Sequence, residues 1–148
     1  MGTWGTGPFD NDAAADFAGA LDDAGPERRV AMVRDVLVRT IEARGWLADA
    51  DAAVAAAALV AAQCPGGEPV DTVYGPEQPM PAFPEDLRKP ADEALARTAT
   101  DPCGPAPNWV EAEYAEQWQA VLVRLRAVLV PPPTTSASDA ARPARRAR

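Results

Sequence analysis

A run of small apolar residues at positions 52–62 places the strongest constraint on how this chain can fold. It reads AAVAAAALVAA, and alanine has the highest intrinsic helix propensity of the amino acids. A helix that is apolar nearly all round has to be covered by other elements on most of its sides. The run therefore predicts a central helix, capped by Asp49 or Asp51 and ending near Gln63, with neighbouring helices packed closely against its short side chains.

Four further segments carry apolar residues at helical spacing between a start signal and a glycine or proline that ends the helix. They are residues 12–24, 26–44, 90–99 and 109–130. Asp10 or Asn11 is the expected cap of the first segment, and Asn108 with Glu111 forms an N-x-x-E capping box for the last. The sequence therefore predicts an all-α fold, a compact bundle of about five helices.

Proline and glycine dominate much of the remaining chain. Residues 64–84 form a long connection, a kind of loop that is often functional or mobile in compact domains. Its apolar side chains predict that it lies against the helices; they are Val70, Val73, Tyr74, Met80 and Phe83. Residues 132–148 are rich in proline, alanine and arginine and offer too little apolar surface to bury. This composition predicts a disordered basic tail after a single domain over residues 1–131.

The sequence leads to separate predictions for two tryptophans and two cysteines. Trp118 lies in the apolar stripe of the last predicted helix and is expected in the core, whereas Trp46 is expected to pack at the junction of two helices. Cys64 and Cys103 both lie in loop segments. The sequence does not show whether they approach each other, and free thiols are the expectation in a reducing cytosol.

The charge of the chain is uneven and limits its partners. The net charge is −8, but four arginines and one aspartate give the segment after residue 130 a charge of +3, which leaves −11 for the rest. A body this acidic repels phosphate backbones, so nucleic acid is not an expected partner.

No apolar stretch is long enough to span a membrane, and no secretory leader is recognisable. A cytoplasmic location is expected, and the oligomeric state stays open.

The residue types that most catalytic sites use are scarce in this chain. It contains no histidine, which is the commonest general base and metal ligand in proteins. Serine occurs only at positions 136 and 138, in the predicted tail, and no phosphate-binding loop or C-x-x-C pair is present. We therefore expect no enzymatic activity and assign no catalytic residue, cofactor site or metal site.

The opening residues, MGTWGTGPFD, hold three glycines and a proline and predict an irregular loop that carries Trp4 and Phe9. These aromatic side chains either close the end of the bundle or present a rigid surface to a partner. Carboxylates follow at Asp12 and Asp16 on the first predicted helix. They are explained by helix capping and a solvated acidic face, and the alternative is a divalent metal site.

The same N-terminal segment, W-G-T-G-P-F-D-N-D, resembles the signature of a bacterial family of unknown function, DUF4259. The matching residues are Trp4, Gly5, Gly7, Phe9, Asn11, Asp12, Ala14 and Asp16. The alanine run and the final helix are similar too, so the resemblance covers most of residues 1–130. Phe17 departs from the pattern, since this position is often tryptophan in such proteins. The resemblance implies a shared fold and no particular reaction.

Two functions of different classes follow from these observations. The first is a non-catalytic, cytoplasmic, protein-binding helical domain of regulatory or immunity-like type, whose acidic body favours a basic partner. The alternative is a small-molecule or metal-binding domain that uses the N-terminal loop and the acidic first helix. The candidate site is the same in both cases and consists of Trp4, Gly5, Gly7, Phe9, Asn11, Asp12 and Asp16.

Overall fold

The computed structural model describes residues 5–109 and 111–130, and this part of the chain folds into five α-helices. Their bounds are α1 Asp12–Asp22, α2 Pro26–Glu42, α3 Ala50–Ala62, α4 Arg88–Thr100 and α5 Ala112–Leu129. Two short 3-10 turns, Glu85–Leu87 and Ala106–Asn108, precede α4 and α5. The prediction of an all-α bundle of about five helices is confirmed. The predicted tail over residues 132–148 lies outside the described residues.

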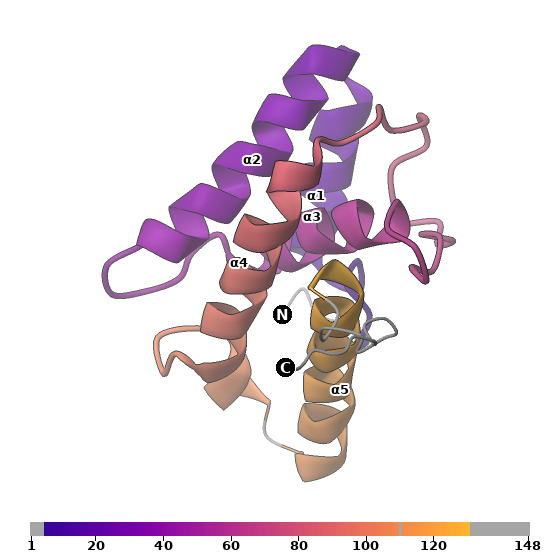
Figure 1. The fold of residues 1–148 in the computed structure, drawn as a ribbon. Coiled ribbons are helices and arrows are strands. Elements are labelled where there is room, and N and C mark those ends of the chain that lie inside the picture. Colours follow the sequence, from indigo (N-terminus) through magenta and orange to yellow (C-terminus); the bar gives the residue numbers. More distant parts are fainter. Residues whose placement is uncertain (1–4, 110, 131–148) are drawn as a thin grey trace, which may run out of the picture.

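The alanine-rich helix α3 is central, as its composition predicts. It contacts each of the other four helices and runs across the middle of the fold (Figure 1). Ala55, Ala56 and Ala57 are completely buried. A methyl side chain lets a neighbouring helix approach near the short end of the usual 8–10 Å range between helix axes. The core is therefore built around the backbone of α3.

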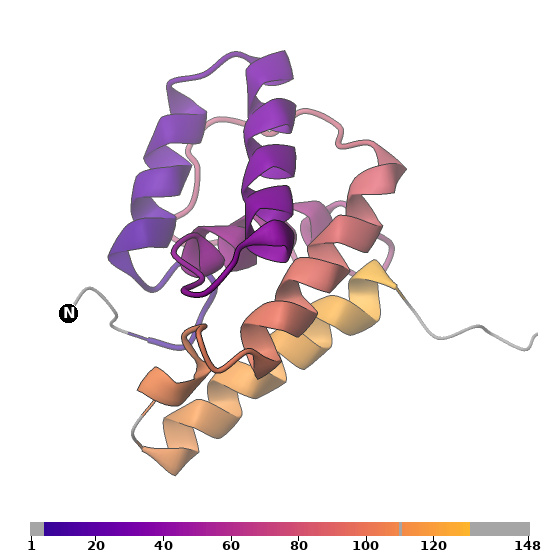
Figure 2. The same cartoon turned by 90° about the vertical axis from the view of Figure 1, so that its left-hand side faces the viewer.

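The other helices are arranged around α3. α1 and α2 follow each other along the chain as an antiparallel hairpin (Figure 2), whereas α4 packs against both α2 and α5. Gly25 occupies the N-cap position of α2 and Pro26 its first turn, where the missing N–H of proline costs nothing. Leu21 of α1 and Val33 and Leu37 of α2 are completely buried and join the hairpin to the core.

Two predicted helix starts, and the capping of a third helix, differ from the structure. Asn108 lies in a 3-10 turn, and α5 begins after Glu111 with no side-chain cap, so the predicted capping box is wrong. α4 starts at Arg88, because the preceding turn leads directly into it, and Pro90 lies in its first turn as predicted. Asp49 occupies the N-cap position of α3, but its carboxylate pairs with Arg39 at 3.2 Å instead of capping the helix.

The predictions for the two tryptophans have opposite outcomes. Trp118 is 6% exposed and packs in the core against Trp109, with ring centroids 6.0 Å apart. Trp46 is 61% exposed, so its predicted packing at a helix junction is wrong. Gly45 adopts a positive φ of 78° in the turn after α2, and Leu47, two residues later, is the residue that enters the core.

Arg97 of α4 joins the end of α2 to the loop that follows α4. Its guanidinium donates to the carbonyl oxygens of Thr40 and Ile41 at 3.1 and 2.6 Å, and its Nε pairs with Asp101 at 3.0 Å. The Cys103 amide and the Arg97 guanidinium both donate to Asp101 and hold the pKa of its carboxyl below the usual value. Unpaired helix-end carbonyls are thereby satisfied.

The prediction that the long loop lies against the body is correct for most of its apolar side chains. Val70, Met80 and Phe83 pack against the core, whereas Val73 is 86% exposed and Tyr74 is exposed as well. Cys64 is buried at the start of this loop, and both cysteines are free thiols. In the described part of the chain, no helix has the length and apolar character needed to cross a membrane.

Candidate ligand-binding cavity

The N-terminal loop, residues 5–11, is shaped by a turn that the carboxylate of Asp10 closes. The Asp10 amide donates to the Gly7 carbonyl at 3.1 Å, and its Oδ2 accepts from the Gly7 amide at 3.0 Å. Pro8 sits at the second position of this β-turn, where proline is favoured. The spacing G-P-x-D is therefore the sequence signal for the turn, and Asp10 is part of it rather than the cap of α1.

The glycines of the motif leave room for that carboxylate. A Cβ on Gly5 would lie 2.5 Å from Asp10 Oδ2, and one on Gly7 would lie 2.8 Å from the same atom. Contacts this short force the carboxylate to move and weaken its hydrogen bond to the loop. Gly5 and Gly7 therefore have a structural role.

The remaining motif residues also serve the fold. Phe9 is 2% exposed and belongs to the core, so it packs inside the bundle instead of facing a partner. Asn11 is the N-cap of α1, since its Oδ1 accepts from the Ala14 amide at 2.8 Å. Asp12 and Asp16 are exposed on α1. Trp4, the other predicted aromatic anchor, lies outside the described residues.

The predicted carboxylates do not gather into a metal site. In the described ranges, no group of three or more histidine, cysteine, aspartate or glutamate side chains is placed to hold a metal ion. Asp10 is committed to the turn at Gly7, while Asp12 and Asp16 point to solvent. Nothing in this part of the molecule supports the metal-binding alternative.

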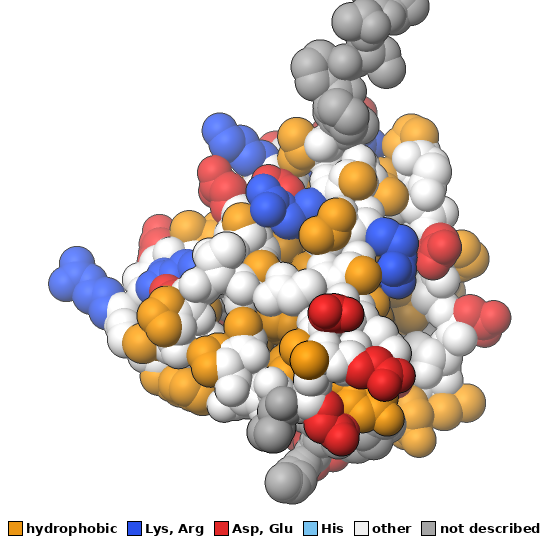
Figure 3. All heavy atoms as spheres, turned by 90° about the horizontal axis from the view of Figure 1, so that it is seen from below, with side chains coloured by type: hydrophobic (Ala, Val, Ile, Leu, Met, Phe, Trp, Pro, Cys, Tyr) orange, Lys and Arg blue, Asp and Glu red, His pale blue; other side chains and the backbone are white. Residues whose placement is uncertain are grey.

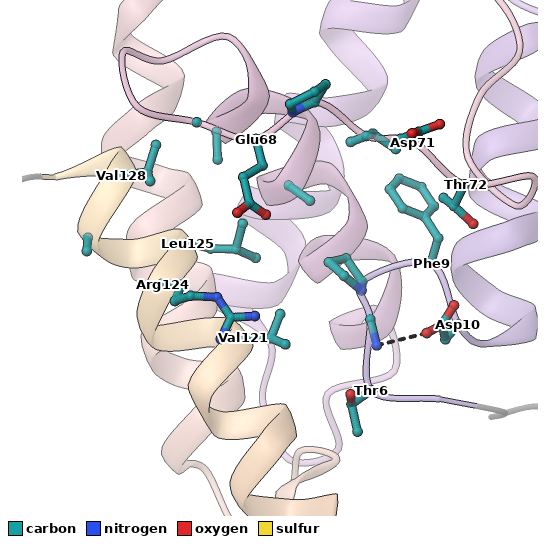
Figure 4. Close-up of a pocket in the computed structure, with 18 of the residues that line it drawn as sticks. Thr6, Phe9, Asp10, Glu68, Asp71, Thr72, Val121, Arg124, Leu125 and Val128 are labelled. Carbon is teal, nitrogen blue, oxygen red and sulfur yellow. Dashed lines mark hydrogen bonds between the residues drawn. The ribbon is translucent and has the colours of Figure 1, made fainter.

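A cavity of about 620 Å³ lies beside the N-terminal loop. Its walls come from the N-terminal loop, the first half of the long loop and α5, and α3 supplies its floor (Figure 4). The residues that line it are Thr6, Gly7, Pro8, Phe9, Asp10, Ala58, Ala61, Gly66, Gly67, Glu68, Pro69, Val70, Asp71, Thr72, Val121, Arg124, Leu125, Ala127 and Val128. Three segments that are distant in sequence thus meet at one hollow.

A pair of glycines brings the long loop to this cavity. Gly66 has a positive φ of 84°, a conformation that glycine adopts without the Cβ penalty. Gly67 passes so close to the end of α3 that a Cβ on it would lie 1.8 Å from the Ala61 carbonyl oxygen. The chain can take this path only with glycine at position 67, and the path places Glu68 at the rim of the cavity.

Two side chains of opposite charge face the cavity from different walls. Arg124 extends from α5 and Glu68 from the long loop, and both reach towards the space between them, whereas Asp71 points away from it (Figure 4). Arg124 is the cationic side chain among the described lining residues. Within the described residues, neither Arg124 nor Glu68 has a hydrogen-bond or ion-pair partner.

The second half of the long loop is attached to the body by polar side chains from three helical regions. The carboxylate of Asp22 accepts from the amides of Glu77 and Gln78, both at 2.9 Å. Gln63, at the end of α3, donates to the Pro81 carbonyl and accepts from the Phe83 amide, both at 2.8 Å. These contacts hold the loop in place as it returns towards α4.

Arg29 of α2 provides the third attachment. This buried side chain donates from Nε to the Leu21 carbonyl at 2.8 Å and from its terminal nitrogen to the Pro79 carbonyl at 3.0 Å. It therefore connects the end of α1 to the long loop. Neither Asp22 nor Arg29 stands out in the sequence, because the loop residues that they hold lie 50 to 56 positions away along the chain.

These features define a class of protein: a five-helix domain with a cavity beside its N-terminal motif. The comparison with known families assigns the chain more closely: the family of domains of unknown function DUF4259 matches residues 2–121, and the chain belongs to this family. The match includes the N-terminal loop and Glu68 and ends before Arg124. No curated protein and no solved structure matched.

Proposed function

We propose that this domain binds a small amphipathic organic molecule in the cavity beside the N-terminal loop, without chemical turnover. The observation that carries the proposal is the cavity itself, whose volume of about 620 Å³ falls within the range of about 300–1,000 Å³ for small-molecule sites. It is bounded by the N-terminal loop, the long loop and two helices and opens to solvent, and its walls are in place without a ligand.

The lining of the cavity supports an amphipathic ligand. Ala58, Ala61, Leu125 and Val128 offer apolar surface, and each Å² of apolar ligand surface that leaves water contributes about 25 cal/mol. Charged groups stand at the rim, where they remain hydrated until a ligand arrives. A ligand with an apolar body and a polar end would satisfy both parts, because the apolar contacts give affinity and the charges give orientation.

Binding without turnover is supported by the residue types at the cavity. The chain has no histidine, and the described lining residues include no cysteine, serine, lysine or tyrosine. The hydroxyls of Thr6 and Thr72 have no neighbouring base within the lining other than carboxylates. A guanidinium such as that of Arg124 stays protonated and does not act as a base. The lining thus offers means to hold a ligand rather than to activate a nucleophile.

The roles of the motif residues also favour a small ligand over a macromolecule. Phe9 is buried and Asp10 closes a turn, and both line the cavity, while Asn11 caps a helix. These residues therefore support the fold and one cavity wall rather than projecting as anchors for a partner. A basic protein partner, suggested by the net charge of −8, stays a prediction. On the face shown in Figure 3, acidic and basic side chains are both spread among hydrophobic ones.

The location we propose is the cytoplasm. The two cysteines are both unpaired, and Cys103 is partly exposed. Unpaired thiols are the usual state in a reducing compartment.

The test uses 8-anilinonaphthalene-1-sulfonate, a dye with an apolar body and an anionic end. We expect saturable binding with one site per chain, seen as a rise in dye fluorescence. Val121 points into the cavity (Figure 4), so Val121→Phe should fill part of it and weaken dye binding at least about tenfold, a loss of roughly 1.4 kcal/mol. Thermal unfolding of each variant verifies that it is folded.

Val123→Phe is the matched control. Val123 lies on the same helix, is 63% exposed and does not line the cavity, so this variant should bind the dye like the parent. If the two folded variants lose dye binding equally, the cavity is not a ligand site.

A further inference from the structure

We infer that the ligand of this cavity is a small apolar zwitterion of the amino-acid type, with its carboxylate on Arg124, its ammonium group on Glu68 and its apolar side chain on the floor. The inference rests on the function proposed above and names the chemical class of the ligand. It comes from the placement of two opposite charges at one cavity without contact between them.

The first observation is that neither Arg124 nor Glu68 has a hydrogen-bond or ion-pair partner among the described residues. Four arginines form ion pairs with aspartates, including Arg126 of the same helix, which meets Asp92 at 2.8 Å. Arg124 and Glu68 instead face the same cavity from different walls and stay apart. A bound molecule with both charges would bridge them.

The second observation concerns the other carboxylates at the cavity. Asp10 already accepts the Gly7 amide, and the side chain of Asp71 points away from the cavity (Figure 4). Asp10 keeps its charge but lies on the N-terminal loop, away from Arg124 and Glu68 (Figure 4), so the charges that reach into the space between the walls are one cation and one anion. A ligand with only a negative group would meet Glu68 unfavourably, and a ligand with only a positive group would meet Arg124 unfavourably. A zwitterion satisfies both, and a guanidinium is well suited to hold a carboxylate through two parallel hydrogen bonds.

The third observation is the apolar floor beneath the two charges. Leu125 and Val128 of α5 and the methyl groups of Ala58 and Ala61 of α3 line it. A purely polar zwitterion would leave this surface in contact with water. A hydrophobic side chain on the zwitterion would cover it, which selects an apolar amino acid over a polar one.

Three probes with the same phenyl body test the charge requirement: L-phenylalanine, 3-phenylpropanoate and phenethylamine. We expect calorimetric titration of the full chain at neutral pH to show L-phenylalanine binding at least about tenfold more tightly than either singly charged probe. Glu68→Gln should remove the advantage over 3-phenylpropanoate, and Arg124→Gln should remove the advantage over phenethylamine. Arg44→Gln, which changes an exposed arginine that does not line the cavity, should leave all three affinities unchanged.

The double exchange Glu68→Arg with Arg124→Glu gives a further readout, because it should restore the preference for L-phenylalanine that Glu68→Arg alone abolishes. Equal affinity for all three probes, or tighter binding of a singly charged probe, would overturn the zwitterion class. If none of the three binds while the anilinonaphthalene dye still does, the class is wrong and the cavity remains a ligand site. If the dye fails as well, both proposals fall.

Discussion

The two halves of the long loop between α3 and α4 are held to the body in different ways. The second half, residues 76–84, is fixed by hydrogen bonds from Asp22, Arg29 and Gln63. The first half, residues 64–75, follows its path through close backbone contact at Gly67, turns closed by local hydrogen bonds and the packing of Val70. The half with the polar attachments is structural, and the other half forms the cavity wall.

This difference shows how one loop can combine rigidity with a binding surface. Polar attachments between segments distant in sequence fix the return of the chain to α4. The first half has fewer such attachments among the described residues, so Glu68 is free to meet a ligand. Binding segments are commonly drawn from the less stable parts of a fold.

The largest effect is expected at the glycine where the loop leaves α3. A Cβ on Gly67 would lie 1.8 Å from the Ala61 carbonyl oxygen, so Gly67→Ala forces the backbone to move and should lower the free energy of unfolding by about 3 kcal/mol. Urea unfolding measures the change. Gly19→Ala, at an exposed position of α1 with open space around it, should instead stabilise the protein slightly. An unfolding midpoint of Gly67→Ala close to that of the parent would disprove the close contact.

Arg29→Met should have the next largest effect. It removes two hydrogen bonds from a buried guanidinium to the Leu21 and Pro79 carbonyls, and hydrogen bonds to charged groups each contribute about 1.5–3 kcal/mol. Met fills much of the same volume without burying a charge, so we expect a net loss of about 2 kcal/mol and faster amide exchange over residues 76–83. Arg28→Met is the control, because Arg28 is exposed and has no partner in the described residues. Equal stability of the two variants would show that Arg29 does not fix the loop.

Gln63→Ala should lower the free energy of unfolding by a smaller amount, about 1 kcal/mol, since the two hydrogen bonds of Gln63 with the loop are neutral and exposed. The Phe83 amide, which loses its acceptor, should exchange with solvent faster than in the parent, while the Gly75 amide in the first half should not change. The control Gln117→Ala alters an exposed glutamine of α5. Protection of Phe83 that is independent of Gln63 would contradict the attachment.

The smallest effect is expected in the first half of the loop. Val73 is 86% exposed, so Val73→Thr should change the free energy of unfolding by less than about 0.5 kcal/mol. Val70 packs against the core, and Val70→Thr should cost about 1 kcal/mol because it places a hydroxyl among apolar side chains. Denaturant midpoints compare the two. A larger loss of stability for Val73→Thr than for Val70→Thr would mean that Val73, and not Val70, is the buried residue in this half.

Local patterns in the sequence were sufficient to predict the helices. The alanine run, the apolar spacing and the signals at Asn11 and Pro26 act within a few residues, and each has its expected role in the structure. The errors lie where tertiary contacts decide the role of a residue. Asp49 pairs with Arg39 instead of capping a helix, and Trp46 is exposed because its neighbour Leu47 enters the core.

The candidate site was only partly predictable for the same reason. The motif identified one wall, including Gly7 and Phe9, but the cavity exists because that wall meets α5 and the long loop. Nothing in the periodicity of α5 distinguishes Arg124 from the other charged residues on its surface. The G-P-x-D turn signal at Asp10 was available from the sequence, whereas the meeting of Glu68 and Arg124 at one cavity depends on tertiary structure.

The alanine floor of the cavity has a consequence for the range of molecules that it admits. Ala58 and Ala61 have no side-chain torsion to adjust, so this surface cannot reshape itself around a larger or differently branched guest. Methionine-rich sites accept many partners because their side chains do adjust. Any tolerance here must come from Glu68, Arg124 and the other longer side chains at the rim. We therefore expect ligands to be sorted by the bulk of the part that enters deepest and only loosely by the part that stays near solvent.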